Sequence, residues 1–88
     1  THLVFVVDDQ DDSRFTIKRL LQQQGHQVEE FSDGLEVVEK AKSLRPSVIF
    51  LDNNMPGMSG IEVLKLLRSD EETKYIPVLL VTANQTTE

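Results

Sequence analysis

Residues 3–9 read Leu-Val-Phe-Val-Val-Asp-Asp, and residues 48–52 read Val-Ile-Phe-Leu-Asp. Each stretch is a short apolar run that ends in carboxylates, as expected where a buried parallel strand gives way to a loop. In open α/β sheets, ligands bind outside the carboxyl ends of the strands, where the strand order reverses. If these two strands are neighbours, the carboxyl groups of Asp8, Asp9 and Asp52 converge on one crevice.

Three clustered carboxylates carry an electrostatic cost. Two like charges about 4 Å apart repel each other by roughly 4 kcal/mol at an effective dielectric constant near 20. A hard divalent cation is the simplest way to offset this repulsion, because Mg²⁺ prefers oxygen ligands and keeps several waters. The sequence therefore predicts a Mg²⁺ site, with Mn²⁺ as an alternative ion, at Asp8, Asp9 and Asp52.

Short apolar runs alternate with amphipathic stretches along the rest of the chain, which favours a parallel sheet with crossover helices. Strands are expected at residues 3–7, 27–31, 48–51 and 78–81. The first helix has candidate caps at Asp11, Asp12 and Ser13, and Gly25 and Pro46 are expected to end the first two helices. The apolar helix faces are expected to consist of Ile17, Leu20, Leu21, Val37, Val38, Ala41, Leu44, Val63, Leu64 and Leu67.

Composition narrows the class of protein. The 88 residues are enough for one small domain. The formal net charge of −6 argues against nucleic acid or an anionic membrane as a direct partner. The chain has no cysteine for a disulfide or a thiolate metal site, and no apolar run approaches the roughly 20 residues that span a bilayer. Because the first residue is Thr1, we expect the chain to be part of a longer protein.

Three stretches together carry a resemblance to a known family: Val6-Val7-Asp8-Asp9, residues 51–60 (LDNNMPGMSG) and Val81-Thr82-Ala83. With this order and spacing, the whole chain resembles the receiver domain of bacterial two-component response regulators. The resemblance implies a flavodoxin-like, three-layer α/β fold whose parallel strands lie in the order 27–31, 3–7, 48–51, 78–81. It also implies a cytoplasmic signalling domain, not an enzyme, that is phosphorylated by a sensor histidine kinase or a phosphotransfer protein.

The resemblance also implies a role for individual residues. Asp52 is the expected phosphoryl acceptor, since a carboxylate can act as a nucleophile and form an acyl phosphate. Asp9 is expected to bind the metal directly, and Asp8 mostly through water. The backbone carbonyl of Asn54 would be the third protein ligand, and the Thr82 hydroxyl would donate a hydrogen bond to a phosphoryl oxygen.

The sequence departs from the family at its C-terminal side. Receivers usually continue with a fourth helix, a fifth strand and a fifth helix, which carry a phosphate-contacting lysine and an aromatic switch residue. No residue here can be assigned to either role, so we expect residues 1–88 to be a single incomplete receiver domain. The strand at 78–81 would then be an exposed apolar edge. It is expected to self-associate or to require a complementing segment from the parent or from another polypeptide.

Two alternative functions remain at this point. The first is a Mg²⁺-dependent phosphatase with an aspartyl nucleophile. Such enzymes generally have a second acid two residues after the nucleophile, and Asn54 at that position argues against this function. A receiver-derived interaction module that is never phosphorylated is the other alternative, and the missing lysine strand makes it plausible for a fragment.

Overall fold

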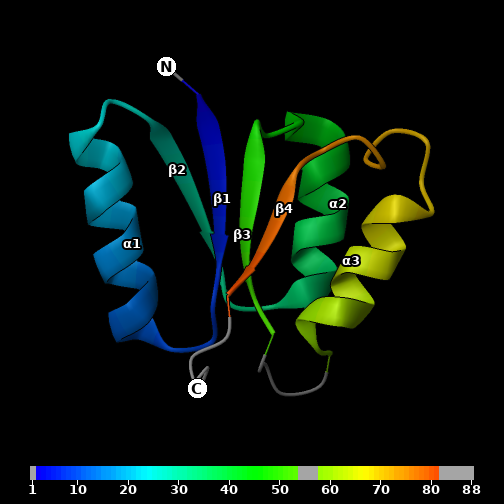
Figure 1. Cartoon of the computed structure of the whole chain (residues 1–88), viewed down its shortest axis with the longest axis horizontal. Helices are drawn as coiled ribbons and strands as arrows, with labels where there is room; N and C mark the ends of the chain where they lie inside the picture. The colour runs from blue at the N-terminus through cyan, green and yellow to red at the C-terminus, as the bar shows by residue number, and fades with distance from the viewer. Residues whose placement is uncertain (1, 54–57, 82–88) are drawn as a thin grey trace, which may run out of the picture.

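The computed structural model describes residues 2–53 and 58–81, which contain a four-stranded parallel sheet and three helices. The strands lie in the order β2-β1-β3-β4, with α1 on one face and α2 and α3 on the other (Figure 1). This arrangement confirms the expected three-layer fold and strand order. The elements are β1 (Leu3–Val7), α1 (Asp11–Gln23), β2 (Gln27–Phe31), α2 (Gly34–Leu44), β3 (Val48–Asp52), α3 (Gly60–Arg68) and β4 (Val78–Val81).

The core lies between the sheet and the helices α2 and α3. Alternate residues of β1 and β3 point to this face, as the two-residue period of a strand requires. Each of the two helices contributes a pair of residues four positions apart, which places both members on the same side of the helix. The core includes Phe5, Val7, Phe31, Ile49 and Leu51 from the strands, Val37, Ala41, Val63 and Leu67 from the helices, and Ile76 from the segment before β4.

Helix α1 begins earlier than its expected caps. Gln10 is the N-cap residue and makes no side-chain capping bond, while Asp11 and Asp12 lie within the first turn. Acidic side chains there interact favourably with the positive end of the helix dipole, so they stabilise the helix without capping it. The expected stop is confirmed, because α1 ends just before Gly25, whose φ of +90° favours glycine.

Two leucines that were expected on the inward faces of helices are exposed. Leu20 and Leu44 have exposed fractions of 59% and 44%. Leu44 lies three positions after the buried Ala41, off the line of four-residue spacing that Val37 and Ala41 form on α2. Leu20 lies on α1, which has no buried residue. A strand that is apolar throughout is expected to be covered on both faces, but β3 is not fully covered on the face toward α1, because Val48 and Phe50 are only half-buried.

Within residues 2–53 and 58–81, no helix is both long enough and apolar enough to cross a bilayer.

Candidate functional site

The three predicted carboxylates meet at the carboxyl ends of two central strands. β1 and β3 are neighbours, with Val7 opposite Leu51, so Asp8 and Asp52 occupy the next position on each chain. One carboxylate oxygen from each of Asp8, Asp9 and Asp52 lies within 4.8 Å of the others. The parallel register therefore brings together residues that are more than forty positions apart in sequence.

Burial makes this cluster electrostatically costly. Asp8 and Asp52 are both buried, whereas Asp9 is more exposed. Burial is the largest cause that raises the pKa of Asp8, and the neighbouring carboxyl groups of Asp52 and Asp9 raise it further. The backbone N–H of Gln10 acts in the opposite direction, donating a hydrogen bond of 2.9 Å to Asp8 Oδ1. The site therefore favours a bound cation or a proton over three bare charges.

The end of β3 is fixed by the start of α3. Asn53 accepts two backbone hydrogen bonds, from Gly60 N–H to its carbonyl and from Ile61 N–H to its side chain, each at 3.2 Å. A Cβ atom on Gly60 would lie 2.8 Å from the Asn53 Cα and from the Asp52 carbonyl oxygen. Only glycine allows this close approach, so Gly60 sets how closely α3 follows the predicted phosphoacceptor.

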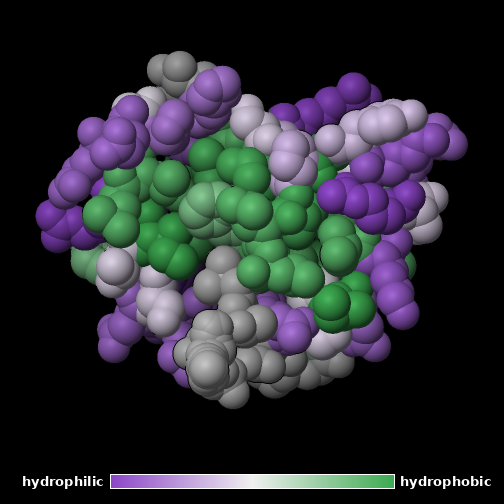
Figure 2. Space-filling model, viewed as in Figure 1, coloured by the Kyte–Doolittle hydropathy of each residue, from purple (hydrophilic) through white to green (hydrophobic). Residues whose placement is uncertain are grey.

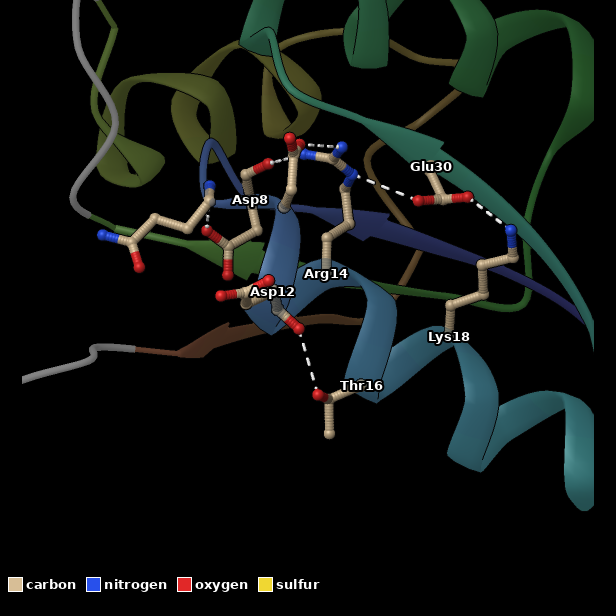
Figure 3. Close-up of polar contacts among 8 residues, drawn as sticks. Asp8, Asp12, Arg14, Thr16, Lys18 and Glu30 are labelled. Carbon is tan, nitrogen blue, oxygen red and sulfur yellow. Dashed lines mark hydrogen bonds and ion pairs between the residues drawn. The ribbon is translucent and has the colours of Figure 1, made fainter.

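One residue of the site has no counterpart in the sequence predictions. Arg14, in the first turns of α1, donates a hydrogen bond of 2.7 Å from Nη1 to the Asp8 carbonyl oxygen (Figure 3). Its guanidinium also binds the carboxylates of Asp11 and Glu30. The sequence shows only that an arginine follows the acid pair by less than two helical turns. An arginine at such a position is also common on a solvent-exposed helix, so the sequence does not single out Arg14.

Comparison with known proteins decides the family. The family model described as the response regulator receiver domain matches residues 4–88. The chain belongs to this family of two-component signalling domains. Among curated relatives, chemotaxis protein CheY-3 of Vibrio cholerae is 41% identical over 81 residues, which cover 91% of this chain and 62% of the relative. The polar-differentiation response regulator DivK of Brucella anthropi is 35% identical over 80 residues, covering 91% of this chain and 65% of the relative.

Solved receiver structures share the fold. The N-terminal domain of a response regulator receiver protein from Methanoculleus marisnigri JR1 superposes with a TM-score of 0.91 at 30% identity, covering 98% of this chain and 70% of that chain. The receiver domain of the sensor histidine kinase PA1611 from Pseudomonas aeruginosa was crystallised with a magnesium ion in its active site cleft. It has a TM-score of 0.89 at 25% identity, covering 94% of this chain and 68% of that chain. This receiver chain spans less than two thirds of the length of the curated relatives above.

The donor set of this receiver fits a hard cation. All three ligand atoms are carboxylate oxygens, and no thiolate or imidazole belongs to the described cluster. Mg²⁺ binds such oxygens together with water. Two further predicted site residues, Asn54 and Thr82, lie outside the described residues, so their roles stay predictions.

Proposed function

We propose that residues 1–88 form the first part of one receiver domain and that its parent protein accepts a phosphoryl group on Asp52. The domain would act in the cytoplasm, and the donor would be a phosphohistidine of a sensor histidine kinase or a phosphotransfer protein. The observation that carries this proposal is the convergence of Asp8, Asp9 and Asp52 within 4.8 Å, at the ends of adjacent strands, in a chain of this family.

The proposed reaction is a phosphoryl transfer from nitrogen to oxygen. A carboxylate oxygen of Asp52 attacks phosphorus, the phosphorus–nitrogen bond of the donor breaks, and its electron pair stays on the departing imidazole. The product is an acyl phosphate. Asp52 is buried at the end of β3, and its backbone pairs with β4, which supports a fixed direction of attack.

The acidic cluster would hold Mg²⁺ or Mn²⁺. Asp9 and Asp52 are the proposed direct side-chain ligands, Asp8 would act mostly through water, and the backbone carbonyl of Asn54 would be the third protein ligand. When bound, the cation neutralises charge on the carboxylates and on the incoming phosphoryl oxygens. The Thr82 hydroxyl would donate a hydrogen bond to one of those oxygens. The magnesium ion in the PA1611 receiver supports the assignment of the ion.

The exposed edge of the sheet supports a further part of the proposal. Within the described part of the chain, β4 pairs only with β3, and Leu79 and Leu80 are 54% and 38% exposed. An apolar edge with free backbone groups is a template for another strand. We propose that a complementing segment of the longer parent chain covers this edge, since the curated relatives are longer than this chain.

A covalent label tests the phosphoacceptor assignment. The full-length parent is treated with a small phosphodonor and Mg²⁺, reduced with borohydride, and mapped by mass spectrometry. We expect an alkali-labile acyl phosphate at Asp52 that is lost in Asp52→Asn and retained in Asp12→Asn, an exposed acid on α1. Undiminished labelling of Asp52→Asn would contradict the assignment. Tight binding of beryllofluoride would exclude an interaction module that cannot be phosphorylated.

A further inference from the structure

We infer that Arg14 is a positioning residue for the acidic cluster: it fixes the backbone of Asp8 and thereby the orientation of the Asp8 and Asp9 carboxylates toward a cation. The inference rests on the proposed metal site. It concerns a side chain whose hydrogen bonds go to the Asp8 carbonyl oxygen, Asp11 and Glu30, so that it acts on the cluster through the backbone of Asp8.

Arg14 joins three segments of the chain (Figure 3). Nη1 donates to the Asp8 carbonyl oxygen at 2.7 Å, Nε donates to Glu30 Oε1 at 3.2 Å, and Nη2 binds the Asp11 carboxylate. The guanidinium therefore connects the loop after β1, the first turn of α1 and the end of β2. A planar fork of donors suits this task, because each N–H has a fixed direction.

The backbone of Asp8 is held from both sides by β2. Its N–H donates to the Phe31 carbonyl oxygen at 3.0 Å, and its carbonyl is tied through Arg14 to Glu30, the residue before Phe31. The Asp8 carboxylate is held separately by the Gln10 N–H at 2.9 Å. The N–H, the carbonyl oxygen and one carboxylate oxygen of Asp8 thus have directional partners. Groups that orient metal ligands in this way commonly contribute to metal affinity.

The partners of Arg14 are themselves held in place. Only 16% of the Arg14 side chain is exposed, and Lys18 Nζ binds the second oxygen of Glu30 at 2.7 Å. The hydrogen bonds from Lys18 and Arg14 lower the pKa of the Glu30 carboxyl, so Glu30 stays ionised as their shared partner. The hydrogen bond between Arg14 and Asp8 therefore belongs to a network with Glu30 and Lys18 and is not an isolated surface interaction.

The charge of Arg14 and its positioning role predict opposite changes in Mg²⁺ affinity when Arg14 is removed. A guanidinium next to the carboxylates repels an incoming dication, so charge alone predicts that its removal tightens Mg²⁺ binding. Loss of positioning predicts weaker binding, because Asp8 and Asp9 would then sample orientations that do not converge. The direction of the change in Mg²⁺ affinity therefore separates the two roles.

The test is a calorimetric titration of the full-length protein with MgCl₂. We expect Arg14→Ala to weaken Mg²⁺ binding about tenfold, the low end of the range for groups that orient metal ligands. Arg14→Lys should recover part of the loss, since one ammonium can reach the Asp8 carbonyl but cannot form the whole fork. Arg19→Ala is the matched control. It removes the same charge from α1, at a side chain that lies over the Phe15 ring, and should change Mg²⁺ affinity by less than about twofold.

A second variant and a metal-free readout guard against simple misfolding. Glu30→Gln keeps Arg14 but weakens its support, and should lower Mg²⁺ affinity by a smaller factor. Without metal, the Gln10 amide should exchange with solvent faster in Arg14→Ala than in Arg19→Ala, measured by NMR on folded protein.

Two contrary results are distinguishable. A wild-type protein that binds no Mg²⁺ would overturn the proposed metal site, and the role of Arg14 with it. A wild type that binds Mg²⁺ no more tightly than a folded Arg14→Ala variant would overturn the role of Arg14 alone.

Discussion

The two faces of the sheet are covered to different extents. Toward α2 and α3, the strand residues Phe5, Val7, Ile49 and Leu51 are at most 1% exposed. Toward α1, Val4 and Val6 of the central strand β1 are also buried, but Phe50 of β3 is half-buried, and Leu79, its neighbour on β4, is 54% exposed. Figure 2 shows apolar side chains gathered across the centre of the molecule on the side where β4 lies in front.

The difference follows from the number of helices on each face. Two helices pack side by side against one face, and each gives it fully buried residues, whereas α1 contributes no buried residue. A helix must bury an apolar stripe against a layer of comparable width to complete a core. Most of the free energy of folding should therefore come from the face toward α2 and α3. The face toward α1 keeps apolar surface exposed, which a further segment could cover.

Truncation of a core leucine should give the largest effect. Leu67 is fully buried on α3, and Leu67→Ala should lower the free energy of unfolding by about 2–5 kcal/mol, through lost transfer energy and a residual cavity. Leu79→Ala, on the face toward α1, should cost less than about 1 kcal/mol because half of that side chain already contacts water. Urea denaturation measures both changes. Equal losses would mean that the two faces contribute alike.

An added methyl group should disturb the contact between the helices of the covered face. A Cβ atom on Gly34 would lie 2.5 Å from Val63 Cγ2 and 3.3 Å from the Met58 sulfur. Gly34→Ala should therefore destabilise the protein by about 1–3 kcal/mol, the usual cost of overpacking. Leu35→Ala, at the next and exposed position of α2, is the control and should change stability little. If Gly34→Ala is neutral in thermal unfolding, α2 and α3 can separate at low cost.

The sequence predicted the strands well, because each is an apolar run with clear boundaries. The convergence of Asp8, Asp9 and Asp52 was predictable for the same reason, since topology alone aligns the carboxyl ends of neighbouring parallel strands. The extent of coverage on each face was not predictable, because the exposure of Leu20 depends on what packs beside its helix. The periodicity of apolar residues along a helix does not show how much of the neighbouring layer covers that helix.

Arg14 was not predictable for a related reason. Its partners lie at positions 8, 11 and 30, and only the pairing of β1 with β2 brings the last of these into reach. In sequence, it reads as one more charged residue on an amphipathic helix. The structure separates it from Arg19 by its contacts, not by its composition or spacing.

Substitutions in the acidic cluster, at the carboxyl ends of the packed strands, should have smaller effects on stability than those in the core. Asp8→Asn keeps an oxygen that can accept the Gln10 hydrogen bond but removes a buried charge, so it should raise metal-free stability by about 1 kcal/mol. Asp9→Asn should raise it less, because Asp9 is more exposed. Mg²⁺ should reverse the order, stabilising the wild type more than either variant by mass action.

The pH dependence of the Asp8→Asn effect has a definite sign. The pKa of Asp8 is raised in the folded protein, so the folded state holds this proton more tightly than the unfolded chain does. Metal-free wild type should therefore lose stability as the pH rises from 3.8, the ordinary pKa of an aspartate, through the raised pKa of Asp8. The stability advantage of Asp8→Asn should appear over the same pH range and vanish below pH 3.8. Thermal unfolding in EDTA measures both. A lower melting temperature for Asp8→Asn at neutral pH would mean that the cluster is not strained.

The smallest change in stability is expected from Leu79→Lys, which tests what the incompletely covered face is for. Leu79 points toward the α1 side and is largely exposed, so a lysine can extend its ammonium into water, and the free energy of unfolding should change by no more than about 0.5 kcal/mol. Leu80→Lys should cost more, because Leu80 lies close to Gly60 at the start of α3.

The same substitution should have a larger effect on association. If the edge of β4 and its apolar face require a partner segment, the 88-residue chain alone should self-associate with rising concentration, and Leu79→Lys should reduce that association. Sedimentation velocity over a concentration series, with and without a peptide carrying the remaining segment of the parent, measures this. Added peptide should restore a monomeric complex in the wild type, and bind less well to Leu79→Lys. If the wild-type chain is a compact, cooperatively folded monomer at every concentration, then α1 alone covers its face well enough, and the contrast between the faces has no consequence for assembly.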